Sequence, residues 1–191
     1  MRDSWQIFIR LKNRGGIMQS KIRIKTAKRK NDAERISILA NEIWKEYFTP
    51  IIGKDQVKYM LDKFQSPQRI YEDITSEEYT YYIVYYSKKL IGYFAVRADK
   101  DDEGVFISKF YLKKDFRGNG VGRLMMNEVL EYAKEIGKKS ICLNVFKDNT
   151  DAINIYKKMG FVIAGKIKTD IGQGFFMDDV KMELKGKKYT G

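Results

Sequence analysis

The sequence predicts an α/β fold in which a central, mixed, mostly antiparallel twisted sheet is flanked by helices. Residues 21–26 alternate between charged and apolar side chains, as in a half-buried strand. Apolar residues in 33–48 recur at helical spacing. A polar loop with glycines, 113–120, joins a strand pattern at 105–112 to a helix pattern at 121–136. Strands and helices that interleave in this way indicate the α/β class.

The other elements follow from the same periodicities and from the turn residues between them. Asn31 or Asp32 is the expected N-cap of the first helix. Residues 68–75 could add a short turn or a further helix. The expected order is β-α-α-β-β-β-α-β-α-β-β, with strands at 21–26, 79–87, 90–98, 105–112, 140–145, 161–169 and 176–184, and helices at 33–48, 54–64, 121–136 and 150–159.

A chain of 191 residues suffices for one domain with its own core. We expect a single domain at 18–191, because Met18 is a second start-like methionine just before the first strand. Residues 1–17 are then an N-terminal extension. Arg10 interrupts the apolar run near the start, and no small-residue cleavage site follows it. No stretch approaches the roughly 20 apolar residues of a membrane helix, so no membrane partner is expected.

The residue types exclude several kinds of chemistry. The chain has no histidine, which removes Ser-His-Asp and Cys-His catalysis and argues against a zinc site. Any general base must therefore be a carboxylate, a lysine, a tyrosine or a water. The one cysteine, Cys142, cannot form an internal disulfide, which suits a reducing cytoplasm.

The net charge of +12 predicts an attraction to polyanions. Both the phosphates of a cofactor and the backbone of RNA fit that description, and charge alone does not separate them. The lysines are scattered along the chain, and no arginine-rich or aromatic RNA-binding motif occurs. Nucleic acid is therefore not the expected partner.

The strongest local motif is the segment Phe116-Arg117-Gly118-Asn119-Gly120-Val121-Gly122-Arg123. The first N–H groups of a helix have no intrahelical partners, and the helix dipole adds positive charge there. Glycines let phosphate oxygens approach the main chain. An ordinary strand-to-helix turn would also use glycines. The loop lacks the Gly-Lys-Ser/Thr ending of nucleoside triphosphate loops and the G-x-G-x-x-G spacing of dinucleotide sites.

Two motifs in the right order resemble those of the GNAT acetyltransferases. Residues 117–122 match R/Q-x-x-G-x-G/A, and residues 149–161 are similar to N-x-x-A-x-x-x-Y-x-x-x-G-F. The resemblance covers about residues 20 to 185 and is nearest to bacterial spermidine/spermine acetyltransferases, also through Met177-Asp178-Asp179-Val180. It implies acetyl-CoA as co-substrate and no metal. The cofactor-binding residues it implies are Tyr111, Leu112, Arg117, Gly118, Asn119, Gly120, Val121, Gly122, Arg123, Asn149 and Lys158.

The resemblance also implies how catalysis is divided among residues. Tyr156 matches the family tyrosine beside the CoA sulfur, where a phenol can donate a proton to the leaving thiolate. The alternative is a core tyrosine packed between helix and sheet. A backbone N–H near Leu112, where the strand splays, would polarise the thioester carbonyl. Asn149 would bond the pantetheine arm, cap the following helix, or do both.

The general base is not assigned by the sequence. Many relatives carry a glutamate on the strand before the loop, where this chain has Ser108. An alkyl ammonium has a pKa of about 10, so a proton must be removed before attack. A water at Ser108 could relay it. Glu103 and Asp178 are possible carboxylates that nothing in the sequence places near the reaction.

The acceptor amine is expected between the first two helices and the last hairpin. Trp44, Tyr47 and Phe48 could wall a groove there, and Asp178 with Asp179 could attract a cation. Aromatic residues at helical spacing are more often core, and paired aspartates on a strand are often only solvated.

The predicted function is transfer of the acetyl group of acetyl-CoA to a primary amine, by direct attack in a ternary complex. A small molecule such as a polyamine is the predicted acceptor. Two alternatives remain: acetylation of a protein N-terminus or lysine, and a non-catalytic module that senses CoA or binds RNA. The sequence allows a monomer or a homodimer.

Overall fold

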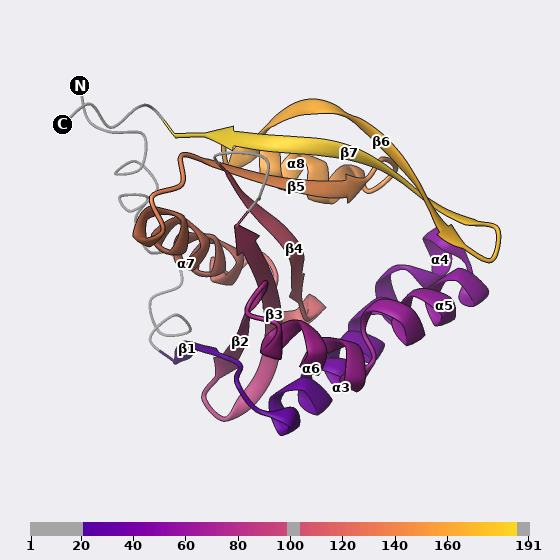
Figure 1. Cartoon of the computed structure of the whole chain (residues 1–191), viewed down its shortest axis with the longest axis horizontal. Coiled ribbons are helices and arrows are strands. Elements are labelled where there is room, and N and C mark those ends of the chain that lie inside the picture. The colour runs from indigo at the N-terminus through magenta and orange to yellow at the C-terminus, as the bar shows by residue number, and fades with distance from the viewer. Residues whose placement is uncertain (1–20, 99–103, 187–191) are drawn as a thin grey trace. The chain divides into compact units, whose positions relative to one another are not determined.

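The computed structural model describes residues 21–98 and 104–186 (Figure 1). The extension expected at 1–17 lies outside the described residues, and a single domain at 18–191 remains a prediction. The described residues form two compact units. The N-terminal unit comprises 21–97 and 109–128, and the C-terminal unit comprises 98, 104–108 and 129–186.

The elements follow the predicted order, with three additions. The additions are α4, a single turn; α6, which occupies the segment left open between a turn and a helix; and the 3₁₀ turn η1, inside the predicted loop. The elements are β1 (Ile22–Thr26), α3 (Lys30–Tyr47), α4 (Thr49–Ile52), α5 (Lys54–Phe64), α6 (Pro67–Thr75), β2 (Thr80–Tyr86), β3 (Lys89–Ala98), β4 (Gly104–Leu112), the 3₁₀ turn η1 (Lys114–Phe116), α7 (Val121–Glu135), β5 (Ser140–Phe146), α8 (Thr150–Lys158), β6 (Val162–Gly172) and β7 (Phe175–Lys185).

Helix α3 begins three residues before the predicted start. Its N-cap is Arg29, whose side chain accepts no capping hydrogen bond. Asp32 acts instead from inside the first turn, where its Oδ2 accepts the backbone N–H groups of Lys28 at 3.1 Å and Arg29 at 3.2 Å. A carboxylate three residues into a helix can satisfy these donors and extend the helix toward its N-terminus.

The predicted fold class is confirmed by the strand ladders. The hydrogen-bonded order is β1-β2-β3-β4-β5-β7-β6. The pair β4–β5 is parallel, whereas β1–β2, β2–β3, β5–β7 and β6–β7 are antiparallel. The sheet is therefore mixed and mostly antiparallel, as expected from its hairpin-rich order.

In the N-terminal unit, helices α3, α5 and α6 pack together beside the sheet (Figure 1). Tyr81 and Tyr93 reach toward them: the Tyr81 hydroxyl donates to Asp73 of α6, and the Tyr93 hydroxyl donates to Gln65 after α5. The opposite face carries a separate aromatic layer, in which Phe94 stacks on Tyr82 at 4.6 Å. Strand residues thus alternate between two packed faces.

In the C-terminal unit, β6 and β7 form a long hairpin (Figure 1). Its turn has positive φ at Gly172, Gln173 and Gly174 (94°, 54° and 77°), which explains the two glycines. Strand β7 also pairs along β5 from Ser140↔Lys185 to Phe146↔Asp179. Among the described residues, no helix is long and apolar enough to cross a membrane.

Candidate active site

The glycine-rich loop leads into α7 in the N-terminal unit. Gly118 and Gly120 have φ values of 75° and 81°, which strongly favour glycine. Apart from the adjoining backbone, a Cβ built on Gly118 or Gly122 would meet no atom of the described residues within 4 Å, so the space above these backbones is open. The first turn of α7 contains no acidic residue. Its N–H groups, from Val121 onward, therefore form a surface that fits an anion.

Arg117 fixes this loop to the strand before it. Its Nε–H donates to the Leu112 carbonyl at 2.9 Å, and its guanidinium lies 5.0 Å from the centre of the Tyr47 ring. The Asn119 side-chain amide donates to the Arg117 carbonyl at 3.1 Å. Three predicted cofactor residues, Leu112, Arg117 and Asn119, are therefore joined by hydrogen bonds, and Tyr47 of the predicted acceptor set lies against them.

The predicted acceptor aromatics meet β4 in the same unit. Trp44 lies 4.6 Å from Phe48 and 5.5 Å from Tyr111, measured between ring centres. Tyr111 also contacts Tyr93 at 5.3 Å. Trp44 is only 4% exposed, so the core alternative describes it well, whereas Tyr47 and Phe48 at the end of α3 are half-buried.

Strand β3 approaches β4 very closely beside this aromatic cluster. A Cβ at Gly92 would lie 2.8 Å from the Tyr111 carbonyl oxygen and 3.0 Å from the Leu112 side chain. The Lys113 N–H donates to the Ile91 carbonyl at 2.9 Å in the same region. The end of β4 is therefore held from one side by the β3 backbone and from the other by Arg117.

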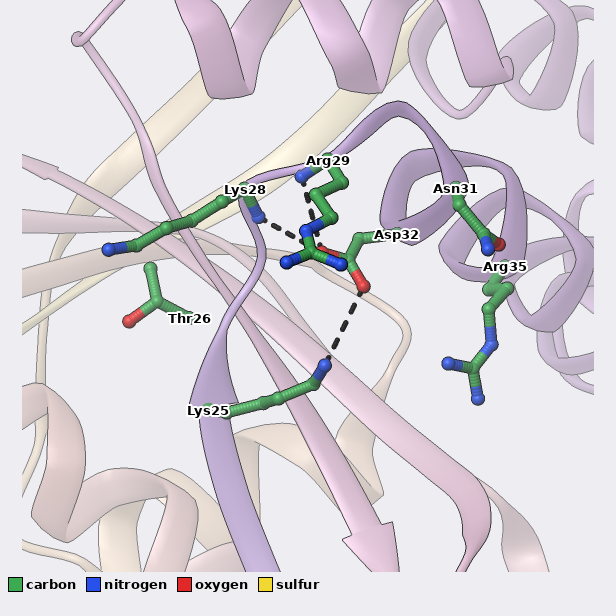
Figure 2. Close-up of a pocket in the computed structure, with 7 residues that line it drawn as sticks. All are labelled: Lys25, Thr26, Lys28, Arg29, Asn31, Asp32 and Arg35. Atoms are coloured by element: carbon green, nitrogen blue, oxygen red, sulfur yellow. Dashed lines mark hydrogen bonds and ion pairs between the residues drawn. The ribbon is translucent and has the colours of Figure 1, made fainter.

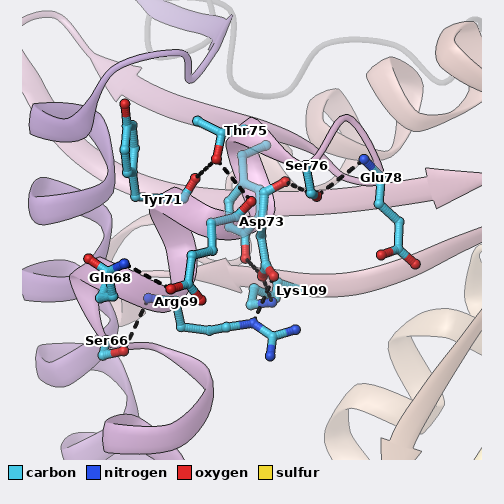
Figure 3. Close-up of polar contacts among 11 residues, drawn as sticks. Ser66, Gln68, Arg69, Tyr71, Asp73, Thr75, Ser76, Glu78 and Lys109 are labelled. Atoms are coloured by element: carbon cyan, nitrogen blue, oxygen red, sulfur yellow. Dashed lines mark hydrogen bonds and ion pairs between the residues drawn. The ribbon is translucent and has the colours of Figure 1, made fainter.

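A buried ionic cluster lies on the face of β4 that also carries Tyr111 (Figure 3). It was not predicted from the sequence. The Lys109 ammonium lies 3.4 Å from Asp73, which also accepts from Arg69 and from the Tyr81 hydroxyl, at 2.8 and 2.7 Å. The ammonium lies 5.1 Å from the Tyr81 ring centre. Burial lowers the pKa of Lys109, and Asp73 opposes that effect. The alternation of the strand could have indicated that Lys109 is buried. Residues 105, 107 and 109 point to the same face of β4, and Val105 and Ile107 are buried.

In the C-terminal unit, the parallel ladder between β4 and β5 is short. It runs from Gly104↔Ser140 to Ile107↔Leu143, although β4 continues to Leu112 and β5 to Phe146. Ser108, the residue at the family glutamate position, is the first β4 residue beyond the last pair. Its half-buried hydroxyl is therefore located where the two strands stop pairing.

Asn149 is the N-cap of α8, and Tyr156 lies within that helix. The Asn149 side chain accepts the Ala152 N–H at 3.2 Å, so its capping role is real. The Tyr156 ring packs edge-to-face on Phe161 at 5.5 Å, which is the packing role the sequence left open. Burial raises the pKa of the Tyr156 phenol, so the hydroxyl keeps its proton at neutral pH. Lys158 is exposed at the last residue of the helix.

The two aspartates of β7 differ in their surroundings. Asp178 forms an ion pair with Lys147 at 2.6 Å, and that hydrogen bond lowers its pKa, with Lys168 and Lys166 adding to the effect. Burial and the neighbouring Asp178 charge raise the pKa of Asp179 to about 6. Asp178, the predicted acceptor residue, is thus already paired, while Asp179 is the carboxylate that can exchange a proton near neutral pH.

The structure thus gathers Tyr111, Leu112, the loop 117–123 and the aromatics of α3 within one unit. Ser108, Asn149, Tyr156, Lys158 and Asp178 belong to the C-terminal unit. Within the described residues, no group of three or more histidine, cysteine, aspartate or glutamate side chains could hold a metal ion.

These features define a class: α/β proteins in which a glycine-rich loop, suited to an anion, joins a strand to a helix. The model of the acetyltransferase (GNAT) family matches residues 38–161, and the chain belongs to that family. The matched segment contains both sequence motifs, the loop at 117–123 and the segment 149–161.

Three known proteins illustrate the similarity. The chain is 28% identical over 91 residues to a probable spermine N(1)-acetyltransferase of Bacillus subtilis subsp. natto, covering 44% of this chain and 60% of that protein. It is 31% identical over 67 residues to a peptidyl-lysine N-acetyltransferase of Salmonella typhimurium, covering 35% of this chain and 43% of that protein. The PaiA N-acetyltransferase of Thermoplasma acidophilum, solved with coenzyme A, has a TM-score of 0.73 at 20% identity, over 86% of this chain and 98% of that one.

Proposed function

We propose that the protein transfers the acetyl group of acetyl-CoA to a primary amine, by direct attack in a ternary complex. The observation that carries the proposal is the open glycine loop at the start of α7, tied by Arg117 to the Leu112 carbonyl. In the reaction, the amine nitrogen bonds to the carbonyl carbon and the carbon–sulfur bond breaks. The nitrogen loses a proton and the leaving thiolate gains one.

The residues of the loop fit the phosphates of CoA. Main-chain N–H groups at 118–122 would bind the pyrophosphate, since φ above zero at Gly118 and Gly120 presents the backbone rather than a side chain. Arg117 and Arg123 add positive charge at the same end of α7. Asn149 and Lys158 are proposed as further cofactor contacts, through the pantetheine arm and the adenosine phosphates.

Tyr156 is proposed to protonate the thiolate. Its raised pKa keeps the phenol protonated at neutral pH, so a proton is available for the thiolate. A backbone N–H near Leu112 is proposed to polarise the thioester carbonyl. Ser108 is proposed to hold a water that relays the proton of the amine to solvent, and Tyr156 takes up a proton from solvent after it has donated one.

The acceptor is proposed to be a small amine such as a polyamine. Half-buried Tyr47 and Phe48 can contact a cationic chain through their rings. Asp179 is proposed to supply negative charge on β7, and Asp178 would do so in exchange for its ion pair with Lys147. The similarity to a spermine acetyltransferase supports this class. The similarity to a peptidyl-lysine acetyltransferase supports lysine side chains as the second candidate.

The test is release of CoA from acetyl-CoA with spermidine, spermine, diamines, lysine peptides and N-terminal peptides. We expect turnover with polyamines, reduced roughly 100-fold in Tyr156→Phe if the phenol is the acid. Tyr71→Phe, a half-buried tyrosine on α6, is the matched control and should retain full activity. Turnover only with lysine peptides would select the second candidate. Acetyl-CoA binding without turnover on any amine would contradict catalysis, and the absence of binding would overturn the proposal.

A further inference from the structure

A second basic site lies at the N-terminal end of α3 (Figure 2). An open pocket of about 370 Å³ is lined there by Lys25 of β1, by Lys28 and Arg29 of the connection, and by Asp32 and Arg35 of α3. Four cationic residues and one carboxylate thus line the same pocket. The sequence scatters these residues over eleven positions, and the turn from β1 into α3 brings them around one hollow.

The single carboxylate in this lining does not neutralise it. Asp32 Oδ2 is occupied by the backbone N–H groups of Lys28 and Arg29, at 3.1 and 3.2 Å. Its Oδ1 lies 3.8 Å from the Lys25 ammonium, at the limit of an ion pair. Asp32 therefore serves mainly to start the helix, and the lining keeps an excess of positive charge. An excess of positive charge in one pocket attracts anions.

Two of the cations are held in place by an uncharged group. Arg35 donates to the Tyr85 hydroxyl at 2.8 Å, and its guanidinium lies 5.3 Å from the Tyr85 ring centre. Lys25 lies 5.4 Å from the centre of the same ring. Tyr85 is only 9% exposed, so it is a fixed support. Cations that are positioned by a tyrosine keep their full charge for a ligand, and less conformational entropy is lost on binding.

This pocket is separate from the glycine-rich loop. Arg117 of the loop lies over Tyr47, the last residue of α3, whereas the pocket surrounds the first turns of that helix. The 18 residues of α3 rise about 1.5 Å each, so the two basic sites are roughly 25 Å apart along the helix. A ligand in this pocket does not compete for the loop.

We propose that the pocket binds a small multivalent phosphate, with the chemistry of a triphosphate group. Both residue types bind phosphate oxygens well. Arginine offers paired N–H donors, and lysine offers a point charge on a flexible side chain. The volume falls in the range of small-molecule sites, about 300–1,000 Å³. Nucleic acid is disfavoured because Tyr85, the aromatic residue at the site, is buried beneath Arg35 and Lys25 and offers no face for a base.

The test is a calorimetric titration of the full chain with inorganic tripolyphosphate, with and without saturating CoA. We expect one site that persists with CoA present. Its affinity should fall by roughly tenfold or more in the double variant Lys28→Ala with Arg29→Ala, because both side chains are exposed and contribute charge directly. Lys88→Ala with Lys89→Ala, at the exposed β2–β3 turn, removes the same charge elsewhere and should bind normally.

Three results would overturn the proposal. Equal weakening in both double variants would mean that the whole positive field attracts the anion. Displacement by CoA would place the anion at the loop. Binding of a single-stranded RNA that depends on Lys28 and Arg29, without tripolyphosphate binding, would assign the surface to nucleic acid. Because the titration without CoA needs no acetyl transfer, its outcome is independent of the proposed enzyme activity. Thermal unfolding of each variant verifies that it folds.

Discussion

The Arg117 side chain donates its Nε–H to the Leu112 carbonyl at 2.9 Å, which ties the glycine-rich loop to the end of β4. The hydrogen bond involves one edge of the guanidinium, and the guanidinium carbon also lies over the Tyr47 ring, 5.0 Å from its centre. The bond to Leu112 takes up only the Nε–H, so it leaves the terminal N–H groups of the guanidinium unused. Arg117 therefore both shapes the loop and contributes charge to it.

Arg117→Ala should weaken CoA binding about tenfold or more, since it removes the charge together with the bond that orders the loop. Arg117→Lys keeps the charge but cannot reproduce the planar bond and ring contact, so it should recover only part of the affinity. Arg123→Ala, which removes an exposed charge on the first turn of α7, should cost less. Calorimetry with CoA measures all three. Equal losses for Arg117→Ala and Arg123→Ala would mean that the tie to Leu112 is irrelevant to binding.

Gly118→Ala should reduce CoA affinity by more than it reduces stability. Its φ of 75° strains alanine by about 1 kcal/mol, and the new methyl group would project into the open space over the loop. Gly137→Ala, after α7, is the matched control, because Gly137 has a φ of 69° at a helix end and a Cβ there would also meet no atom of the described residues within 4 Å, the adjoining backbone apart. Urea unfolding should show similar losses for both variants. Reduced CoA binding in Gly137→Ala would show that strain, rather than the methyl group, is the cause.

Asp73→Asn should destabilise the fold by about 3 kcal/mol, because it leaves the buried Lys109 ammonium without its counter-charge. Asp62→Asn breaks the exposed pair with Lys58 on α5, and should cost much less because solvent screens that pair. Adding Lys109→Met to Asp73→Asn should restore part of the loss. Chemical denaturation gives each value. A double variant as unstable as Asp73→Asn alone would mean that the unpaired ammonium is not the source of the loss.

Asp179 should make stability fall as pH rises from about 4 to about 6. Its pKa of about 6 in the folded protein exceeds the roughly 3.9 of an unfolded aspartate, so the folded state binds more protons in that window. The stabilisation is complete below about pH 4 and is lost above about pH 6.

Asp179→Asn should therefore stabilise the protein at pH 7, by about 1 kcal/mol after allowance for partial exposure, and lose that advantage at pH 4. Urea midpoints of the two proteins across this range test the claim. Asp151→Asn, on exposed α8 surface, is the control. A pH-independent difference would show that the carboxyl group does not titrate as stated.

Most of the fold was predictable because its signals are local. Alternation in β1, the apolar stripe of α7 and the glycines around the β6–β7 turn each depend on a few neighbouring residues. The early start of α3 was missed because Asp32 caps from inside the helix, so its position in the sequence suggested a later boundary. The loop was predictable because an anion site at a helix start needs only consecutive residues.

The side-chain clusters were not predictable in the same way. Lys109 meets Asp73 across 36 residues of sequence, and nothing local marks either residue as a partner. The pairing of Asp178 with Lys147 likewise depends on β5 lying beside β7. The four cations of the pocket at the start of α3 looked scattered because only the turn from β1 into α3 brings them together.

Position 92 should tolerate no side chain at all. A methyl group there would press on the Tyr111 carbonyl at 2.8 Å, and that backbone has no room to retreat while Arg117 holds the next carbonyl. A library randomised at 92 and selected for folded protein should therefore return glycine almost alone. One randomised at 118 should return glycine with asparagine and aspartate, which tolerate positive φ, when folding is selected, and glycine when CoA binding is selected. The two glycines look alike in the sequence, but the first is required by packing against a neighbouring strand, and the second by its backbone conformation and a ligand.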